Sequence, residues 1–262
     1  EEGHAAVLRI TGRLADIAPC TDCGDCARAL FTMARAGEFV SIRCRVNAAL
    51  GSDQDYEIRP APKKKRVLVV GGGPAGMEAA RVAAIRGHEV LLVEKERRLG
   101  GLLRFVALIK GLDVDGDAMQ VSDYLQNQIE RLGVEIRLGK EFTPADIREM
   151  HPDSILLAPG GVPAVPEIPG MDRCNAVSIE DLHRRMKEDL DLIEPGVMRG
   201  MNRYWESVGD RVVIVGGTIE GVGLAEFLVE RRRKVTLVDE GAIWGDTPLL
   251  RSPSMEKVKR MP

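Results

Sequence analysis

Three cysteines lie close together near the start of the chain, in the stretch CTDCGDC at residues 20–26. Cys20, Cys23 and Cys26 are separated by two residues each, and Cys44 follows after a gap of 17 residues. Thiols at this spacing can bind a metal, form a redox-active pair or join as disulfides. A redox pair would leave two thiols unexplained, and disulfides are uncommon in proteins that are not exported. Three ligands from one loop and a fourth from elsewhere favour an iron–sulfur cluster, with tetrahedral zinc as the alternative.

A glycine motif of the form G-x-G-x-x-G follows the apolar run VLVV at residues 67–70. Gly71 permits a tight turn, Gly73 lets the backbone approach a pyrophosphate, and Gly76 lets helix and strand pack closely. The free N–H groups and the positive end of the helix dipole then face the phosphates. Glu94 ends the next apolar run, where a carboxylate accepts hydrogen bonds from an adenosine ribose. The motif with its strand, helix and acid predicts dinucleotide binding.

The same unit occurs twice. Residues 67–94 and 212–239 align without a gap, so that strand, glycine turn, helix, second strand and final acid coincide at an offset of 145 residues. Strands that alternate with helices imply parallel sheets with right-handed crossovers. The chain is therefore predicted to be an α/β protein with two Rossmann-like dinucleotide-binding units, preceded by a small Cys-rich segment.

The second glycine motif differs from the first at its centre. Gly216, Gly217 and Gly221 are present, but Thr218 stands where the middle glycine is expected, and its Cβ would crowd a closely bound pyrophosphate. Asp239 ends the second strand and favours a free ribose 2′-hydroxyl, because a carboxylate repels a 2′-phosphate. The run RRRK (231–234) is interpreted as decoration of a helix C-terminus, where cations suit the dipole. NADH is thus favoured over NADPH.

Composition excludes several classes of protein. The chain has 262 residues, 44% of them hydrophobic, and a net charge of −3, which gives no indication of a nucleic-acid surface. No apolar run approaches the ~20 residues of a membrane span. The first residues lack the layout of a signal peptide, so we expect a cytoplasmic protein without nucleic-acid or membrane partners. We propose none of the four histidines as a catalytic residue, and we interpret Cys174 as a structural thiol.

The segment GGGPAGMEAARVAAIRGHEVLLVEKERRLGGLL (71–103) resembles the FAD-binding segment of two-dinucleotide-domain flavoprotein reductases. SILLAPGG (154–161) resembles their strand and turn ending in Ala-Thr-Gly, with Pro159 in place of Thr. The resemblance assigns the second glycine motif to NAD(H), the hydride donor, through Gly216, Gly217, Thr218, Gly221 and Asp239. It implies that FAD is contacted by Gly71, Gly73, Pro74, Ala75, Gly76, Glu94, Lys95, Gly100, Gly101, Leu102, Phe142, Ala158 and Gly160.

The cysteine segment APCTDCGDC…CRVNAALG resembles the cluster segment of the trimethylamine dehydrogenase, 2,4-dienoyl-CoA reductase and 2-enoate reductase family, with Ala48 in place of Pro. The resemblance implies a [4Fe–4S] cluster held by Cys20, Cys23, Cys26 and Cys44. LIEPGVMRGMNRYWESVGDRVVIVGG (192–217) resembles the 2-naphthoyl-CoA reductase branch of this family.

The resemblance also implies an organisation. Residues 1–19 would be the exit from an FMN-binding (β/α)8 barrel, residues 20–62 the cluster segment and linker, residues 63–205 the FAD domain, and residues 206–262 the start of an NAD(H) domain that is incomplete. The barrel itself needs some 250 residues and would belong to a longer chain or a separate subunit. An oligomer is expected.

The implied function is an electron-input module: NADH reduces FAD, and electrons pass to the cluster and on to FMN in a barrel that reduces an activated C=C bond. Three alternatives remain open. One is an amine-dehydrogenase-like module that sends electrons out to a carrier, and another is a subunit that docks on a separate catalytic subunit. The third is a zinc-stabilised nucleotide-binding module without a redox role.

Overall fold

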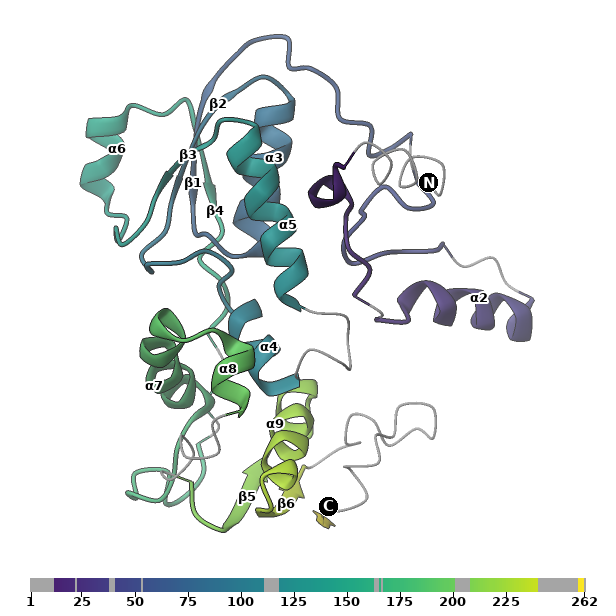
Figure 1. The fold of residues 1–262 in the computed structure, drawn as a ribbon, viewed down its shortest axis with the longest axis vertical. Coiled ribbons are helices and arrows are strands. Elements are labelled where there is room, and N and C mark those ends of the chain that lie inside the picture. The colour runs from purple at the N-terminus through teal and green to yellow at the C-terminus, as the bar shows by residue number, and fades with distance from the viewer. Residues whose placement is uncertain are drawn as a thin grey trace. The chain divides into compact units, whose positions relative to one another are not determined.

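The computed structural model describes residues 12–21, 23–37, 41–52, 54–110, 118–162, 165, 167–200, 208–239 and 259–261 (Figure 1). The chain forms two compact units. The first comprises Glu1–Phe105 with Leu112–Leu192, and the second Val106–Gly111 with Ile193–Pro262. Residues 1–11 of the predicted barrel-exit segment lie outside the described residues.

The first unit contains a four-stranded parallel sheet with the strand order β3-β2-β1-β4. Helices α3 and α5 cover one face of this sheet and α6 lies on the other (Figure 1). Its strands are β1 (Arg66–Val70), β2 (Glu89–Val93), β3 (Glu135–Arg137) and β4 (Ser154–Leu157). Its helices are η1 (Leu14–Asp16), α2 (Asp25–Ala36), α3 (Pro74–Ile85), α5 (Ala118–Arg131), α6 (Pro144–Met150) and α7 (Ile179–Leu192).

Among its described residues, the second unit repeats part of this arrangement. Its described strands form a parallel sheet of order β5-β6-β7, and α9 packs on β6. The elements are α8 (Pro195–Gly200), β5 (Arg211–Val215), α9 (Ile219–Glu230), β6 (Lys234–Val238) and β7 (Lys259–Met261), while α4 (Leu103–Lys110) begins in the first unit and ends in the second.

The core of the first unit explains why β1 is an uninterrupted apolar run. Val67 and Val69 pack with residues of α3 and α5 on one face, while Leu68 packs with Met150 of α6 on the other. Successive side chains of a strand point to opposite faces, so a strand covered on both sides needs apolar residues at every position. The predicted α/β class with parallel sheets is confirmed.

The two units share their strand register. Arg66 is paired with Glu89 in β1–β2, and Arg211 with Lys234 in β5–β6, which preserves the offset found in the sequence. The neighbours differ: β1 lies between β2 and β4, whereas β5 is an edge strand among the described residues, and Val213 is 66% exposed.

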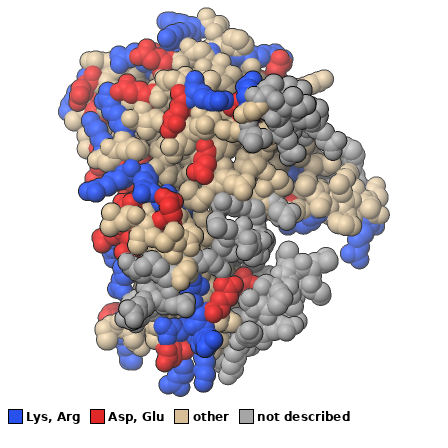
Figure 2. All heavy atoms as spheres, in the orientation of Figure 1, with Lys and Arg blue, Asp and Glu red and all other residues tan. Residues whose placement is uncertain are grey.

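The surface carries both signs of charge. On the face shown in Figure 2, the basic and acidic side chains of the described residues lie interspersed. Within the described part of the chain, no helix is long and apolar enough to cross a membrane.

Helix α6 begins with a charged cap that makes its stability depend on pH. Asp146 Oδ2 accepts hydrogen bonds from the backbone N–H of Thr143 (2.7 Å) and from its hydroxyl (2.9 Å), and Lys140 Nζ lies 2.5 Å from Oδ1. Lys140 first, and then Thr143, lower the pKa of Asp146 from 3.8 to about 2. A depressed pKa in the folded state means that the ionised carboxylate stabilises the fold.

We expect this contribution to be complete above about pH 4 and to be lost as the pH falls through 3.8 towards 2. Thermal unfolding at several pH values should therefore show a smaller acid loss in Asp146→Asn than in the unchanged chain. Glu149→Gln, which alters an exposed carboxylate on the same helix, is the matched control and should follow the unchanged chain. Parallel curves for Asp146→Asn and the unchanged chain would contradict the assignment.

Candidate functional site

The turn after β1 needs glycine at its first position. Gly71 has φ of +109°, and its N–H donates a hydrogen bond to Val93 O at 2.8 Å. A Cβ on Gly71 would lie 2.1 Å from Ala158 O, which follows β4. A side chain is excluded both by the backbone conformation and by this contact.

The start of α3 forms an open cradle. A Cβ on Gly76 would lie 1.8 Å from Gly71 O, so the helix packs directly on the turn. A Cβ on Gly73, in contrast, would meet no heavy atom within 4 Å. Gly73 is the N-cap residue and provides no side-chain cap. The free N–H groups of a helix start beside open space suit a pyrophosphate, and FAD fits this cradle.

Glu94 is fixed beside this cradle. The residue is 8% exposed, and its carboxylate accepts hydrogen bonds from the N–H of Gly72 at 2.5 Å and of Glu96 at 2.8 Å. A buried carboxylate needs such partners, and a carboxylate has about four lone-pair positions. Acceptor positions therefore remain for the hydroxyls of a ribose. Gly72 was absent from the predicted site, although it is the second glycine of GGGPAG and lies between two predicted residues.

The second glycine pair lies against the first motif. Gly100 donates its N–H to Gly72 O at 2.9 Å, and both Gly100 and Gly101 have positive φ. A Cβ on Gly101 would lie 3.1 Å from Gly73 Cα. Gly100 and Gly101 lie at least 27 positions after Gly72 and Gly73 in the sequence, and only the family resemblance assigned them to the same site. The fold brings the two pairs into contact.

The remaining residues of the predicted FAD set are placed around this turn or further from it. Ala158 donates its N–H to Val70 O at 2.8 Å. The turn after β4 therefore keeps its position although Pro159 stands where Thr is usual. Phe142 is half-buried and packs against the cluster of Leu68, Val93 and Met150. The exposed members of the whole set are Pro74, Ala75, Lys95, Gly101, Leu102 and Gly160.

The second unit reproduces the first turn closely. Gly216 has φ of +116° and donates its N–H to Val238 O at 2.8 Å. A Cβ on Gly221 would lie 1.9 Å from Gly216 O, and the N–H of Gly217 donates to the carboxylate of Asp239. The acid at the end of β6 is thus held as Glu94 is held at the end of β2.

The centre of the second turn differs only in its side chain. Thr218 has φ −69° and ψ 173°, close to the φ −74° and ψ 178° of Gly73. Its backbone can therefore present the helix start in the same way, but its Cβ and methyl group occupy space that is open above Gly73. A dinucleotide fits here with a less close approach.

The basic run after α9 serves the fold. Arg231 donates to Phe227 O at 3.2 Å and lies over the Phe227 ring at 3.5 Å, and Arg233 pairs with Asp210. These residues precede β6, whereas Asp239 follows it. They lie at the opposite end of the strand from Asp239, which agrees with their interpretation as helix decoration.

The structure does not gather the four cysteines into a metal site. None of these four cysteines, all of which the structure describes, forms a disulfide, and the described residues contain no group of three or more His, Cys, Asp or Glu placed to hold a metal ion. The donor set fits an iron–sulfur cluster in kind, since it offers four thiols, but the positions do not.

Two features nevertheless connect the two cysteine segments. Cys44 Sγ accepts N–H groups from Val46 and Asn47, each at 3.4 Å, and hydrogen bonds to sulfur are a feature of cluster ligands. Asp25, next to Cys26, binds Arg45, next to Cys44, at 2.9 Å. The ion pair joins the loop of three thiols to the turn of the fourth.

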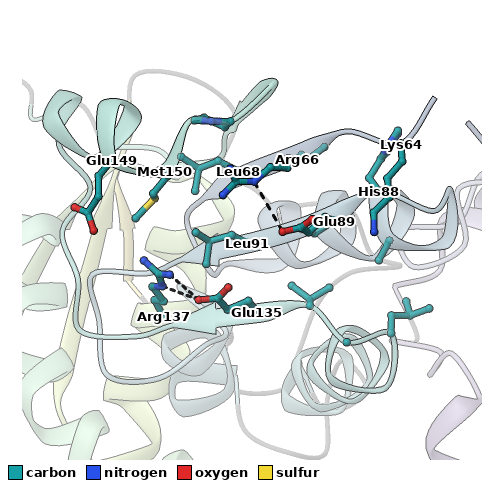
Figure 3. Close-up of a pocket in the computed structure, with 17 residues that line it drawn as sticks. Lys64, Arg66, Leu68, His88, Glu89, Leu91, Glu135, Arg137, Glu149 and Met150 are labelled. Atoms are coloured by element: carbon teal, nitrogen blue, oxygen red, sulfur yellow. Dashed lines mark hydrogen bonds and ion pairs between the residues drawn. The ribbon is translucent and has the colours of Figure 1, made fainter.

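A pocket of about 450 Å³ lies elsewhere in the first unit (Figure 3). It opens where β1, β2 and β3 begin, and two ion pairs line it: Arg66–Glu89 at 3.8 Å and Arg137–Glu135 at 2.7 Å. Ligands of open parallel sheets bind at the carboxyl ends of the strands, which is the other end. This pocket is therefore separate from the glycine turn, and no pattern in the sequence pointed to it.

Two parallel sheets, each with a glycine turn and a tethered acid, define an oxidoreductase module that binds FAD and NAD. Residues 65–249 match the family model described as pyridine nucleotide-disulphide oxidoreductase, and the chain belongs to this family. Within it, the chain corresponds to the C-terminal FAD- and NAD-binding module of 2-enoate reductase-like proteins, as the sequence predicted.

Three similar proteins support this placement. The chain is 34% identical over 225 residues to cinnamate reductase of Clostridium sporogenes, covering 85% of this chain and 29% of that one. It is 35% identical over 206 residues to NADH oxidase of Thermoanaerobacter brockii, covering 78% and 29%. A structure of 2-naphthoyl-CoA reductase with 2-naphthoyl-CoA has a TM-score of 0.78 and 30% identity, covering 98% of this chain and 36% of that one. The chain thus spans about three tenths of the length of these curated relatives.

Proposed function

We propose that this chain is the electron-input module of a flavin enzyme, in which the first glycine turn holds FAD and the second binds NADH. When bound, FAD accepts a hydride from NADH and can pass its electrons on singly. The observation that carries the proposal is the repeated unit, with an acid tethered by a glycine N–H beside the helix start in both copies.

The residues of the first turn would bind and orient FAD. The N–H groups at the start of α3 would hold the pyrophosphate over Gly73, and Glu94 would accept hydrogen bonds from the adenosine ribose. The remaining predicted contacts are part of the proposal, and the family resemblance supports them. The functional division at residues 20, 63 and 206 is proposed on the same basis.

Asp239 would select NADH at the second turn. Its carboxylate is tethered by Gly217 N–H, and it would accept hydrogen bonds from a free ribose 2′-hydroxyl but repel a 2′-phosphate. A 2′-phosphate would also need a cation nearby. Arg231 and Arg233, which follow α9, are instead engaged at the opposite end of the sheet from Asp239.

We further propose that the whole protein reduces an activated C=C bond, with the present chain supplying the electrons. Similarity to cinnamate reductase and to 2-naphthoyl-CoA reductase supports this substrate class. The catalytic part would be an FMN-binding barrel in the same chain or in a separate subunit, within a cytoplasmic oligomer. Cys20, Cys23, Cys26 and Cys44 are proposed as ligands of a [4Fe–4S] cluster, whose formation would have to draw the four thiols together.

Anaerobic reduction of the purified flavoprotein tests the input reaction. NADH is expected to bleach the flavin absorption band. NADPH should need a roughly tenfold higher concentration, because the Asp239 carboxylate would repel its 2′-phosphate. A tenfold difference in affinity corresponds to about 1.4 kcal/mol. Asp239→Ser should narrow this difference. Asp210→Asn, which alters a 93% exposed side chain before β5, is the control.

The competing functions predict other results. Bleaching by dithionite but not by NADH would overturn the NADH assignment and favour an amine-dehydrogenase-like module. A colourless protein that contains zinc would overturn the redox function altogether.

A further inference from the structure

Residues 94–105, which we call the strap, run from the end of β2 to the start of α4 and pass along the first glycine turn. The strap begins with Glu94 and contacts the turn through Gly100, whose N–H donates to Gly72 O at 2.9 Å. The strap contains five of the proposed FAD contacts: Glu94, Lys95, Gly100, Gly101 and Leu102. Its position therefore sets where the ribose acceptor and the second glycine pair stand.

Helix α7 holds the strap at three places. Lys187 Nζ lies 2.5 Å from Glu96 Oε1, and Arg104 Nη2 donates to Leu190 O at 2.7 Å. Close to the second contact, the rings of Phe105 and His183 meet edge to face with centroids 3.9 Å apart. The first pair spans 91 residues of sequence and the second 86, so α7 is a distant element that determines the position of the strap.

Glu96 links α7 to the ribose acceptor. Its N–H donates to Glu94 Oε1 at 2.8 Å, its carbonyl oxygen accepts the N–H of Gly139 at 2.9 Å, and its carboxylate is paired with Lys187. The same residue is thus held by its side chain from α7 and holds Glu94 by its backbone. A displacement of Glu96 would move the N–H that orients the Glu94 carboxylate.

The Lys187–Glu96 pair contributes little to stability by itself. The two side chains are 42% and 29% exposed, and ion pairs that water reaches are worth at most about 1 kcal/mol. An effect on ligand affinity larger than the effect on unfolding would therefore reflect position rather than loss of fold.

We propose that α7 positions the strap for FAD and that Lys187 is the positioning residue, acting through Glu96 on Glu94. The inference rests on the proposed binding of FAD at the first turn. Lys187 does not touch the ligand in this account; it fixes the geometry of a residue that does.

The test measures FAD binding to the deflavinated chain by fluorescence quenching, together with the visible circular dichroism of the bound flavin. Lys187→Gln should weaken FAD binding about fivefold and alter the dichroism. Lys187→Arg should restore both, because it keeps the charge. Arg184→Gln is the matched control, since Arg184 lies on the same helix and pairs with Asp181 one turn away. The unfolding temperature of the deflavinated protein should be similar for all three variants.

The outcomes separate the two proposals. An unchanged chain that takes up no FAD overturns the proposed function. If the unchanged chain binds FAD, equal affinity in Lys187→Gln overturns only the role of Lys187. An equal loss in Arg184→Gln also overturns it, because any change on α7 would then have the same effect.

Discussion

Gly73→Ala is expected to leave the deflavinated protein as stable as the unchanged chain and to weaken FAD binding by about a hundredfold. A Cβ on Gly73 meets no protein atom within 4 Å, so nothing in the fold opposes the methyl group. The same space is where a pyrophosphate would approach the start of α3, and a forced contact of this kind costs about 1–3 kcal/mol. Titration of FAD into the deflavinated protein, beside a thermal melt of the same sample, measures both quantities.

Gly76→Ala is the contrasting variant. Its Cβ would lie 1.8 Å from Gly71 O, so the deflavinated protein itself should lose stability. Gly209→Ala serves as the neutral control, because its Cβ would come no closer than 4.0 Å to its nearest neighbour. The assignment of the first turn fails if Gly73→Ala retains full FAD affinity, or if its melt falls as far as that of Gly76→Ala.

Cys44→Ser is expected to abolish the iron and acid-labile sulfide that the purified protein carries under the proposed function, and to remove the associated broad absorption. A serine oxygen is a poor substitute for a thiolate in cluster ligation, and the turn of Val46 and Asn47 is arranged around sulfur. Cys23→Ser should behave in the same way. Cys174→Ser alters an exposed thiol outside the two cysteine segments and should retain full iron content.

Metal analysis of the unchanged chain decides between the alternatives. About four iron atoms per chain support the cluster, and stoichiometric zinc instead would establish the structural-metal alternative. Arg45→Gln tests the ion pair that joins the two segments and should lower iron content without removing a ligand. If Cys44→Ser keeps its iron, the fourth ligand has been assigned wrongly.

The parts of the fold that the sequence predicted are those with local signals. The run VLVV, the three glycines after it and the acid at residue 94 are all contained within a single βαβ unit. The offset of the second unit then predicted its strand register, which Arg66–Glu89 and Arg211–Lys234 reproduce.

The features that the sequence did not reveal depend on distant contacts. Lys187 meets Glu96 across 91 residues, and nothing in the pattern of α7 distinguishes Lys187 from its neighbouring cations. The cysteines also show that sequence spacing does not reveal tertiary contacts. Their spacing named four ligands, but bringing Cys44 to the others depends on tertiary contacts such as Asp25–Arg45, and the thiols are not assembled in the structure.

Under the proposed function, Thr218 would give the two dinucleotide sites different rates of ligand dissociation. A prosthetic group has to remain through many catalytic cycles, whereas a reductant has to depart after each one. The bare backbone at Gly73 would permit the closest approach, while the Thr218 side chain would hold the second ligand slightly further away at closely similar backbone angles. Differences in affinity between related sites are expressed mainly in dissociation rates. One side chain would thus favour slow dissociation of FAD from the first site and rapid exchange of NAD(H) at the second.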